Sequence, residues 1–165
     1  MIIVSACLCG INCRYDGDNN LNERVLKLLK EGKALPVCPE QLGGLATPRE
    51  PCEILNENGL DVIDGKITIV GLNNNDITSK FLKGAYETLK IAQNIGATCA
   101  ILKARSPSCG VSKIYDGTFS STLRQGNGVT TQLLLSNGIK VFTEEDLDDI
   151  KLWLELKRTP NWSPF

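Results

Sequence analysis

Four short apolar runs recur along the chain, and segments with helical periodicity separate them. The runs occupy residues 2–6, 34–37, 99–103 and 139–142. Runs of this length that are mainly apolar predict strands buried on both faces, as in parallel sheets. Parallel strands are joined by crossover connections, which are right-handed. The pattern therefore predicts an α/β fold, a three-layer sandwich with a mainly parallel sheet.

The helices between these strands have recognisable starts and ends. The clearest spans residues 76–95, where apolar side chains recur at spacings of three and four and Gly96 follows. An earlier helix is expected to begin at Asn20 or Asn22 and to turn Leu21 and Val25 inward. Two later helices are expected. A short one follows Gly126-Asn127-Gly128, and a last one follows the fourth strand.

A small β-hairpin is predicted as an insertion at about residues 58–71. Residues 60–63 and 66–70 alternate apolar side chains on either side of Asp64-Gly65, and an Asp-Gly pair in that setting favours a tight hairpin turn. The segment after Cys38 is predicted to be irregular because prolines and glycines interrupt it. The length of 165 residues suits a single domain over residues 1–165, with an irregular tail at about 159–165.

Composition and charge exclude several classes of protein. The chain has seven cysteines, no histidine and a formal net charge of −1. Near-neutral charge argues against a protein built mainly to coat nucleic acid. No basic leader stands at the start, and no apolar run approaches the roughly 20 residues that span a bilayer. An odd number of cysteines does not complete a disulfide framework. We therefore expect a cytoplasmic protein with reduced thiols and no membrane contact.

Three of the cysteines are expected to meet at one site. Cys7 and Cys38 each follow a predicted strand by one residue, and Cys109 lies in the loop after the third strand. Ligands of open parallel sheets bind outside the carboxyl ends of the strands, where the strand order switches. Three thiols from distant parts of the chain are thus predicted to point into one crevice.

The residue types narrow what these thiols could hold. Without histidine, metal chemistry must use thiolates and carboxylates. Zinc usually takes four ligands, often in Cys-x-x-Cys pairs, and the sequence has none. Iron–sulfur clusters are held by thiolates, and a [4Fe–4S] cluster on three of them leaves one iron open as a Lewis acid. Glu40, two residues after Cys38, would face the same way in an extended stretch and suits a general acid or base.

Six motifs in order carry a resemblance to a known family. They are SACLCG, CRYDG, CPEQLGGLATPREP, KARSPSCG, and GNGVTTQLL followed by NGIKVFTEEDL. With this set the chain resembles the family labelled domain of unknown function 523, which includes the thiouracil desulfidases. The resemblance covers nearly the whole chain. It implies a Rossmann-like core with a [4Fe–4S] cluster on the matching positions Cys7, Cys38 and Cys109.

The resemblance also implies a reaction. The substrate would be a small thiolated nucleobase or nucleoside of the 2-thiouracil or thiouridine type, and tRNA is the least favoured because the chain is near neutral. Substrate sulfur would bind the open iron, water would attack the ring carbon, and sulfur would leave as sulfide without net electron transfer. Glu40 would shuttle the proton, Ser106 is the preferred assisting serine, and Ser108 is the alternative as a substrate contact.

The remaining polar residues have two interpretations. Arg14 and Asp16 lie behind Cys7 and either bind substrate or form a surface turn. Lys103, Arg105 and Arg49 either gather positive charge at the crevice, where it attracts an anionic ligand, or form ordinary ion pairs at a solvated rim.

The other cysteines and the function also have alternatives. Cys9 could replace Cys7 as a ligand, Cys13 and Cys52 are interpreted as free thiols near the site, and Cys99 as a small core side chain. Two rival functions remain: a thiol-based sulfur carrier or redox protein that uses Cys7 or Cys109, and a binding module that holds a metal or cluster without catalysis. The oligomeric state is not predicted.

Overall fold

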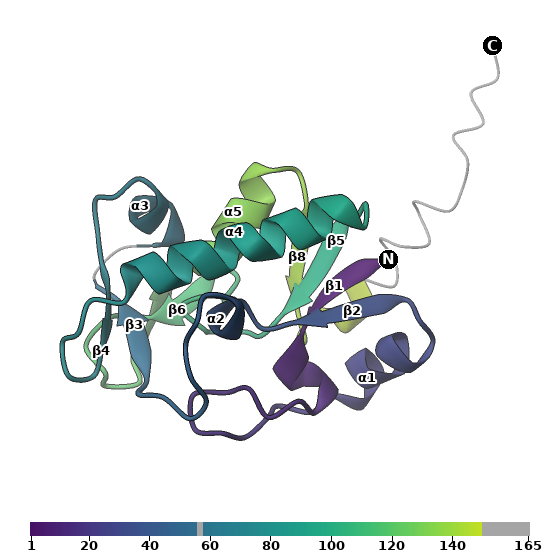
Figure 1. The fold of residues 1–165 in the computed structure, drawn as a ribbon, viewed down its shortest axis with the longest axis horizontal. Helices are drawn as coiled ribbons and strands as arrows, with labels where there is room; N and C mark the ends of the chain where they lie inside the picture. The colour runs from purple at the N-terminus through teal and green to yellow at the C-terminus, as the bar shows by residue number, and fades with distance from the viewer. Residues whose placement is uncertain (56–57, 150–165) are drawn as a thin grey trace, which may run out of the picture.

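The computed structural model describes residues 1–55 and 58–149. A four-stranded sheet lies at its centre, in the order β2 (Ala34–Val37), β1 (Ile2–Ser5), β5 (Cys99–Leu102) and β8 (Lys140–Thr143), and all neighbours are parallel (Figure 1). The chain leaves β1 for β2 on one side and later adds β5 on the other. The strand order therefore switches between β1 and β5, and the predicted parallel sheet is confirmed.

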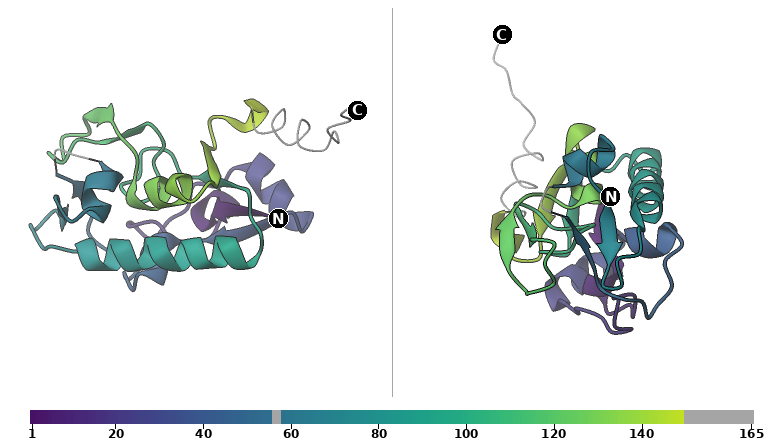
Figure 2. Two further views of the ribbon diagram at one scale, coloured as in Figure 1. Left: turned by 90° about the horizontal axis from the view of Figure 1, so that it is seen from above. Right: turned by 90° about the vertical axis from the view of Figure 1, so that its left-hand side faces the viewer.

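Helices cover both faces of the sheet and create three layers. Alternate residues of a strand point to opposite faces. Ile3 belongs to the core shared with α4 (Thr78–Asn94) and α5 (Val129–Ser136), whereas its neighbour Val4 belongs to the core shared with α1 (Glu23–Lys30). Figure 2 shows α4 and α1 on opposite sides of the strands. The predicted three-layer α/β class is confirmed.

The first helix begins where its sequence signal indicates. The side chain of Asn22 caps α1 by accepting hydrogen bonds from the amides of Arg24 and Val25. Val25 is fully buried, as expected, but Leu21 is 49 % exposed. Leu21 precedes the cap, so it does not belong to the inward face of the helix, and that detail of the prediction is wrong.

A close backbone contact fixes the segment after β2, which folds as the short helix α2 (Pro39–Leu42) against α4. A Cβ atom on Gly84 would lie 1.9 Å from the carbonyl oxygen of Pro39, so only glycine allows this approach. The prediction of irregular structure directly after Cys38 is therefore wrong for these residues. Proline at the first helical position is compatible with a helix start because its missing amide has no intrahelical acceptor there.

The inserted antiparallel pair is present, but its strands are not the predicted ones. Within residues 58–71, the first half forms the helix α3 (Gly59–Ile63), and β4 (Ile69–Gly71) pairs with β3 (Cys52–Ile54) instead. The side chain of Asn58 caps α3 by accepting a hydrogen bond from a first-turn amide at 2.8 Å. This cap favours a helix over the Asp-Gly hairpin.

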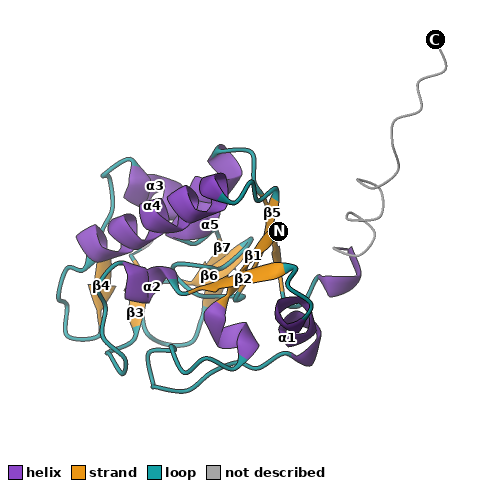
Figure 3. Cartoon of the chain, turned by 45° about the vertical axis from the view of Figure 1, so that its right-hand side comes forward, coloured by secondary structure: helices purple, strands orange, loops and turns teal. Residues whose placement is uncertain are grey.

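Three further elements lie in segments predicted mainly as loops. The 3-10 turn η1 (Ala6–Cys9) follows β1, and β6 (Lys113–Tyr115) pairs antiparallel with β7 (Leu123–Gln125). Figure 3 shows β3 and β4 at one end of the molecule, with β6 and β7 between them and the parallel strands. The strands β6 and β7 therefore stand next to the edge of the sheet where a ligand site is expected.

The last predicted helix and the tail at 159–165 lie mostly outside the described residues. Thr143, predicted as the helix cap, accepts a hydrogen bond at its Oγ1 from the amide of Glu145 at 3.2 Å. In the part of the chain that is described, no helix is long and apolar enough to cross a membrane.

Candidate functional site

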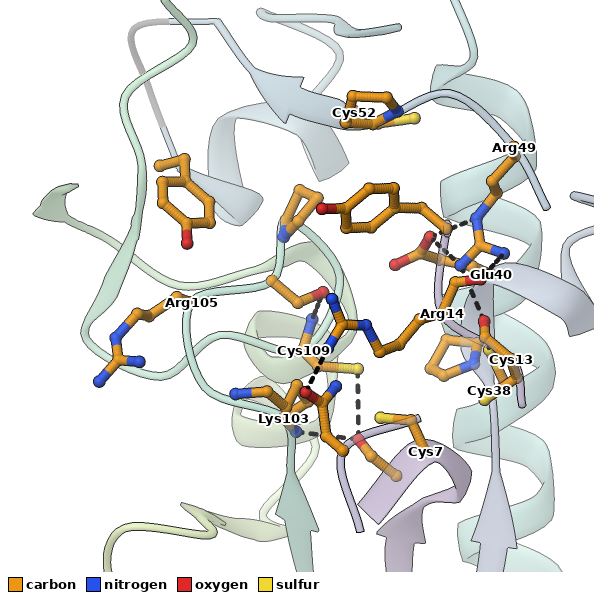
Figure 4. A pocket seen from close by; sticks show the side chains of 18 of the residues that line it. Cys7, Cys13, Arg14, Cys38, Glu40, Arg49, Cys52, Lys103, Arg105 and Cys109 are labelled. Atoms are coloured by element: carbon orange, nitrogen blue, oxygen red, sulfur yellow. Dashed lines mark hydrogen bonds and ion pairs between the residues drawn. The ribbon is translucent and has the colours of Figure 1, made fainter. Parts of the chain in front are cut away.

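A cavity of about 570 Å³ lies at the carboxyl ends of β1, β2 and β5. Cavities of this size hold small molecules and cofactors. Five of the seven cysteines line it, namely Cys7, Cys13, Cys38, Cys52 and Cys109 (Figure 4). The structure therefore brings together the three thiols that the strand pattern placed at one edge, and it adds two more.

Tight turns place the first two of these thiols. Cys7 lies in η1 directly after β1, and Cys38 is the N-cap residue of α2 directly after β2. The carbonyl oxygen of Cys7 accepts hydrogen bonds from the amides of Gly10 and Asn20, at 3.2 and 2.9 Å. Gly10 has a φ of 80°, which favours glycine. Cys9, the alternative to Cys7, is not among the residues that line the cavity.

Hydroxyl groups hold the loop that carries Cys109. The Oγ atom of Ser106 accepts hydrogen bonds from the amides of Ser108 and Cys109, both at 3.1 Å. Thr131 donates to the carbonyl oxygen of Cys109 at 2.8 Å. Ser5, the last residue of β1, donates from Oγ to the Cys109 sulfur at 3.6 Å. These contacts join the loop to β1, the strand that directly precedes the turn with Cys7.

The thiols differ in acidity. The pKa of Cys38 is lowered to about 7, mainly by a hydrogen bond with the Cys13 thiol. The amide of Gln41 lowers this pKa further, whereas burial of the thiol acts in the opposite direction. The hydrogen bond with Cys13 likewise lowers the pKa of Cys7. Burial raises the pKa of Cys109. Cys7 and Cys38 are thus the thiols most readily converted to thiolates, the form that binds metals.

Glu40 lines the same cavity and forms an ion pair with Arg49 (Figure 4). Their charged groups are 2.7 Å apart, and their side chains are only 15 % and 8 % exposed. The expectation of an extended stretch at Glu40 is wrong, since the residue lies in the first turn of α2. Its carboxylate is nevertheless beside Cys38, where it could move a proton to or from a ligand in the cavity.

The guanidinium of Arg49 anchors several parts of the cavity wall. Its Nη2 atom donates to the carbonyl oxygen of Cys13 at 3.1 Å, and its Nη1 atom donates to the carbonyl oxygen of Ala46 at 3.0 Å. Its Nε atom donates to Glu40 at 2.9 Å. One buried cation therefore joins the carboxylate of α2 to the loop that carries Cys13.

Replacing Arg49 by alanine is expected to lower the free energy of unfolding of the cofactor-free protein by about 3 kcal/mol, because it leaves a largely buried carboxylate unpaired. Chemical denaturation measures this change. Arg24→Ala is the matched control, since its ion pair with Asp148 is exposed, with side chains 56 % and 91 % accessible, and exposed pairs contribute little. Equal small losses in both variants would contradict the anchoring role of Arg49.

The two candidate serines have different surroundings. Ser106 lines the cavity, and its hydroxyl already accepts two amide hydrogen bonds, which leaves its proton available to a ligand. Ser108 is 1 % exposed and does not line the cavity. Its hydroxyl pairs with that of Thr130 at 2.8 Å. Ser108 therefore supports the loop rather than facing the cavity, which corrects the expectation that it contacts substrate.

The charged candidates are held in ion pairs. Arg14, Lys103 and Arg105 line the cavity, whereas Asp16 does not. Asp16 forms an ion pair with Arg14 at 2.6 Å. Lys103 forms an ion pair with Glu144, and Arg105 forms one with Glu145. The expected positive rim is therefore largely neutralised, although Arg14 and Lys103 still reach the cavity.

The β6–β7 connection contributes a wall that the sequence did not indicate. Tyr115, Phe119 and Ser121 line the cavity from this side. The buried carboxylate of Glu53 accepts hydrogen bonds from the amides of Gly117 and Phe119, at 2.9 and 3.1 Å. No local signal identifies these residues, because their place at the site depends on a contact between β3 and a distant loop.

The thiol donors of the cavity are the kind of ligand that holds an iron–sulfur cluster. Within residues 1–55 and 58–149, no group of three histidine, cysteine, aspartate or glutamate side chains is gathered closely enough to hold one metal ion. Cys7, Cys38 and Cys109 instead stand around an open cavity from three separate strand ends. Thiol-only ligation over a wider space is what a cluster of several irons requires.

Comparisons with known proteins match most of the chain. Over residues 2–146 the chain matches the protein family described as 2-thiouracil desulfurase. It is 48 % identical over 150 residues to the uncharacterized protein YbbK of Bacillus subtilis (strain 168), which covers 91 % of this chain and 99 % of that protein.

A solved structure is similar throughout. It is the [4Fe-4S]-dependent thiouracil desulfidase TudS (DUF523Vcz), with a TM-score of 0.84, 41 % sequence identity, and coverage of 94 % of this chain and 97 % of that one. All residues that line the cavity lie within the segment matched to the family.

Proposed function

Because the chain belongs to the 2-thiouracil desulfurase family, we propose that it is a [4Fe–4S]-dependent desulfidase that removes sulfur from a thiolated nucleobase or nucleoside. The observation that carries the proposal is the meeting of three strand-end thiols and one largely buried carboxylate in a single cavity. We also propose that the reaction takes place in the cytoplasm, where thiols stay reduced. All seven cysteines lie in the described residues, and none of them forms a disulfide.

Cys7, Cys38 and Cys109 are the proposed cluster ligands. They line the cavity and follow β1, β2 and β5, respectively, which are neighbouring strands around the switch in strand order. A cluster held by three thiolates would supply an iron with an open coordination position, a Lewis acid to which the thiocarbonyl sulfur of the substrate can bind.

Glu40 is the proposed proton carrier. The overall reaction exchanges the thiocarbonyl sulfur for an oxygen from water and releases hydrogen sulfide, so it needs proton transfer but no net electron transfer. The Glu40 carboxylate can take a proton from the attacking water and return it to the departing sulfur. Its ion pair with Arg49 fixes the orientation of the carboxylate toward the cavity.

The cavity wall is suited to a small planar ring. Tyr15, Tyr115 and Phe119 line it together with apolar proline and leucine side chains, and aromatic faces stack on nucleobases. Ser106, with a proton free to donate, and the cations Arg14 and Lys103 are proposed to hydrogen-bond the ring or the water. Intact tRNA is the least favoured substrate, because the net charge of −1 gives no general attraction to phosphates.

The rival based on direct thiol chemistry has less support. A reactive thiol is usually accessible and easily ionised, but Cys109 is 5 % exposed and burial raises its pKa. Cys7, whose pKa is lowered, is the better candidate for such a reaction. A purely binding module would have no use for the oriented Glu40, so catalysis is the better proposal.

The proposed function predicts both composition and activity. Protein purified and reconstituted without oxygen is expected to contain about four irons and four acid-labile sulfides per chain. It is expected to release sulfide from 2-thiouracil or 4-thiouridine with formation of the oxygen analogue. Colourless protein without iron after reconstitution would overturn the proposal. Sulfide release from thiolated tRNA alone would overturn the small-molecule substrate.

A further inference from the structure

Glu53 is a buried carboxylate that the proposed reaction does not use. It is the middle residue of β3, it is 7 % exposed, and it lines the cavity. Its Oε2 atom accepts hydrogen bonds from the amides of Gly117 and Phe119, at 2.9 and 3.1 Å. A buried carboxylate is costly unless hydrogen bonds satisfy it. Both donors belong to the β6–β7 connection, so the carboxylate and this connection stabilise each other.

The backbone of the β6–β7 connection needs such an anchor. Phe119 and Ser121 have φ values of 57° and 63°, in the left-handed region that residues other than glycine rarely adopt. Residues keep this conformation where the surrounding contacts hold them in it. The amide of Phe119 is one of the two donors to Glu53. Glu53 therefore holds the connection at one of its two unfavourable positions.

The same connection forms part of the space for a substrate. Tyr115, Phe119 and Ser121 line the cavity, and aromatic faces stack on the planar rings of nucleobases. Because Glu53 holds the amide of Phe119, loss of the carboxylate would allow the Phe119 ring to leave the cavity wall.

The proposed cluster ligands are held by other contacts. Ser106 and Thr131 hold the backbone of Cys109. Figure 4 shows Cys52, the residue before Glu53 in β3, on the opposite side of the cavity from Cys7. A substitution at Glu53 is therefore expected to change the aromatic wall without removing a ligand of the cluster.

We propose that Glu53 is a positioning residue for substrate binding. It holds the β6–β7 connection so that the Phe119 ring forms one wall for the planar ring of a thiolated nucleobase. Glu53 acts through Phe119 and not through a contact of its own with the substrate, so it affects substrate affinity more than the chemical step. This inference rests on the proposed function, because it requires a substrate with a planar ring.

Steady-state kinetics of the reconstituted variants with 2-thiouracil test this role. Glu53→Ala removes the acceptor and is expected to raise KM about tenfold, the loss in affinity that follows removal of one base-stacking contact. Its iron content and kcat are expected to stay close to those of the parent, since only ground-state binding is lost. Glu53→Gln keeps an oxygen that accepts the two amide hydrogen bonds, and its KM is expected to stay near that of the parent.

Two further substitutions complete the test. Phe119→Ala is expected to raise KM as much as Glu53→Ala does, and the double variant no more than either alone, because both changes remove the same interaction. Asp116→Ala is the matched control. Asp116 accepts an exposed hydrogen bond from the amide of Thr118 at 3.0 Å in the same connection, and it does not line the cavity. Water can replace this hydrogen bond, so KM is expected to be unchanged.

The outcomes separate this inference from the proposed function. An unchanged KM in Glu53→Ala, additive effects in the double variant, or an equal rise in Asp116→Ala would overturn the positioning role. Equal rises in the glutamine and alanine variants would show that the charge itself contacts the substrate, which also contradicts it. Where Glu53→Ala does not fold, Phe119→Ala takes its place: a raised KM supports the aromatic wall, and an unchanged KM overturns it. If the parent protein releases no sulfide from 2-thiouracil or 4-thiouridine, the proposed function fails, and this inference fails with it.

Discussion

Replacing Cys38 by alanine is expected to abolish uptake of the iron–sulfur cluster. Cys38 is held at the start of α2 and is the cavity thiol whose pKa is lowered to about 7, mainly by the hydrogen bond with Cys13. The two remaining thiolates would provide too few bonds to iron to keep the cluster bound. Iron analysis, acid-labile sulfide analysis and visible absorbance after anaerobic reconstitution measure the loss. Cys7→Ala and Cys109→Ala are expected to behave alike.

Two other cysteine variants provide matched controls. Cys9→Ala removes a thiol two residues from Cys7 that is outside the cavity, and Cys52→Ala removes one that lines it. Burial raises the pKa of Cys52 to about 12, so this thiol does not ionise readily. Both variants are expected to bind the full cluster. Loss of iron in Cys52→Ala with retention in Cys38→Ala would show that the ligand set is misassigned.

Replacing Glu40 by glutamine is expected to leave the cluster in place and to slow sulfide release by about a hundredfold or more, the usual effect of losing a general acid or base. Glutamine has nearly the same shape and still accepts the hydrogen bond from Arg49, but it cannot carry a proton. Iron content and steady-state turnover of 2-thiouracil are measured on the same preparation, so that loss of chemistry is separated from loss of cofactor.

The control for this variant is a nearby carboxylate outside the cavity. Glu50 accepts hydrogen bonds from the amide of Asn73 at 2.9 Å and from the side chain of Asn75 at 3.3 Å, and it does not line the cavity. Glu50→Gln is expected to turn over like the parent protein. Normal turnover in Glu40→Gln would remove the proton-transfer role, whereas equal losses in both variants would indicate a general effect on the fold.

The parts of the fold that the sequence predicts correctly are those in which one physical requirement dominates. The buried parallel strands must be apolar on both faces, so the short runs identify them within a residue or two. Asn22 marks the start of α1 because its side chain satisfies free amides there. The same strand pattern predicts the meeting of Cys7, Cys38 and Cys109, since the carboxyl ends of parallel strands share one edge.

The parts that sequence reasoning missed depend on contacts between distant segments. The strands β6 and β7 have three residues each, too few for alternation to be recognised. Glu53 reaches the β6–β7 connection across more than sixty positions of sequence, and no local pattern reports such a contact. Cys13 is a free thiol that lines the cavity, as predicted, but the sequence does not indicate that its carbonyl oxygen accepts hydrogen bonds from Arg49 and Cys38.

The anaerobic crystal structure of the reconstituted protein tests the central claim most directly, namely that three strand-end thiolates hold a cluster with one iron left open. The predicted result is a [4Fe–4S] cluster bonded to the sulfurs of Cys7, Cys38 and Cys109, with no protein ligand on the fourth iron and with the Glu40 carboxylate facing that iron. A cluster closed by a fourth cysteine, or one bound away from this cavity, would contradict the claim.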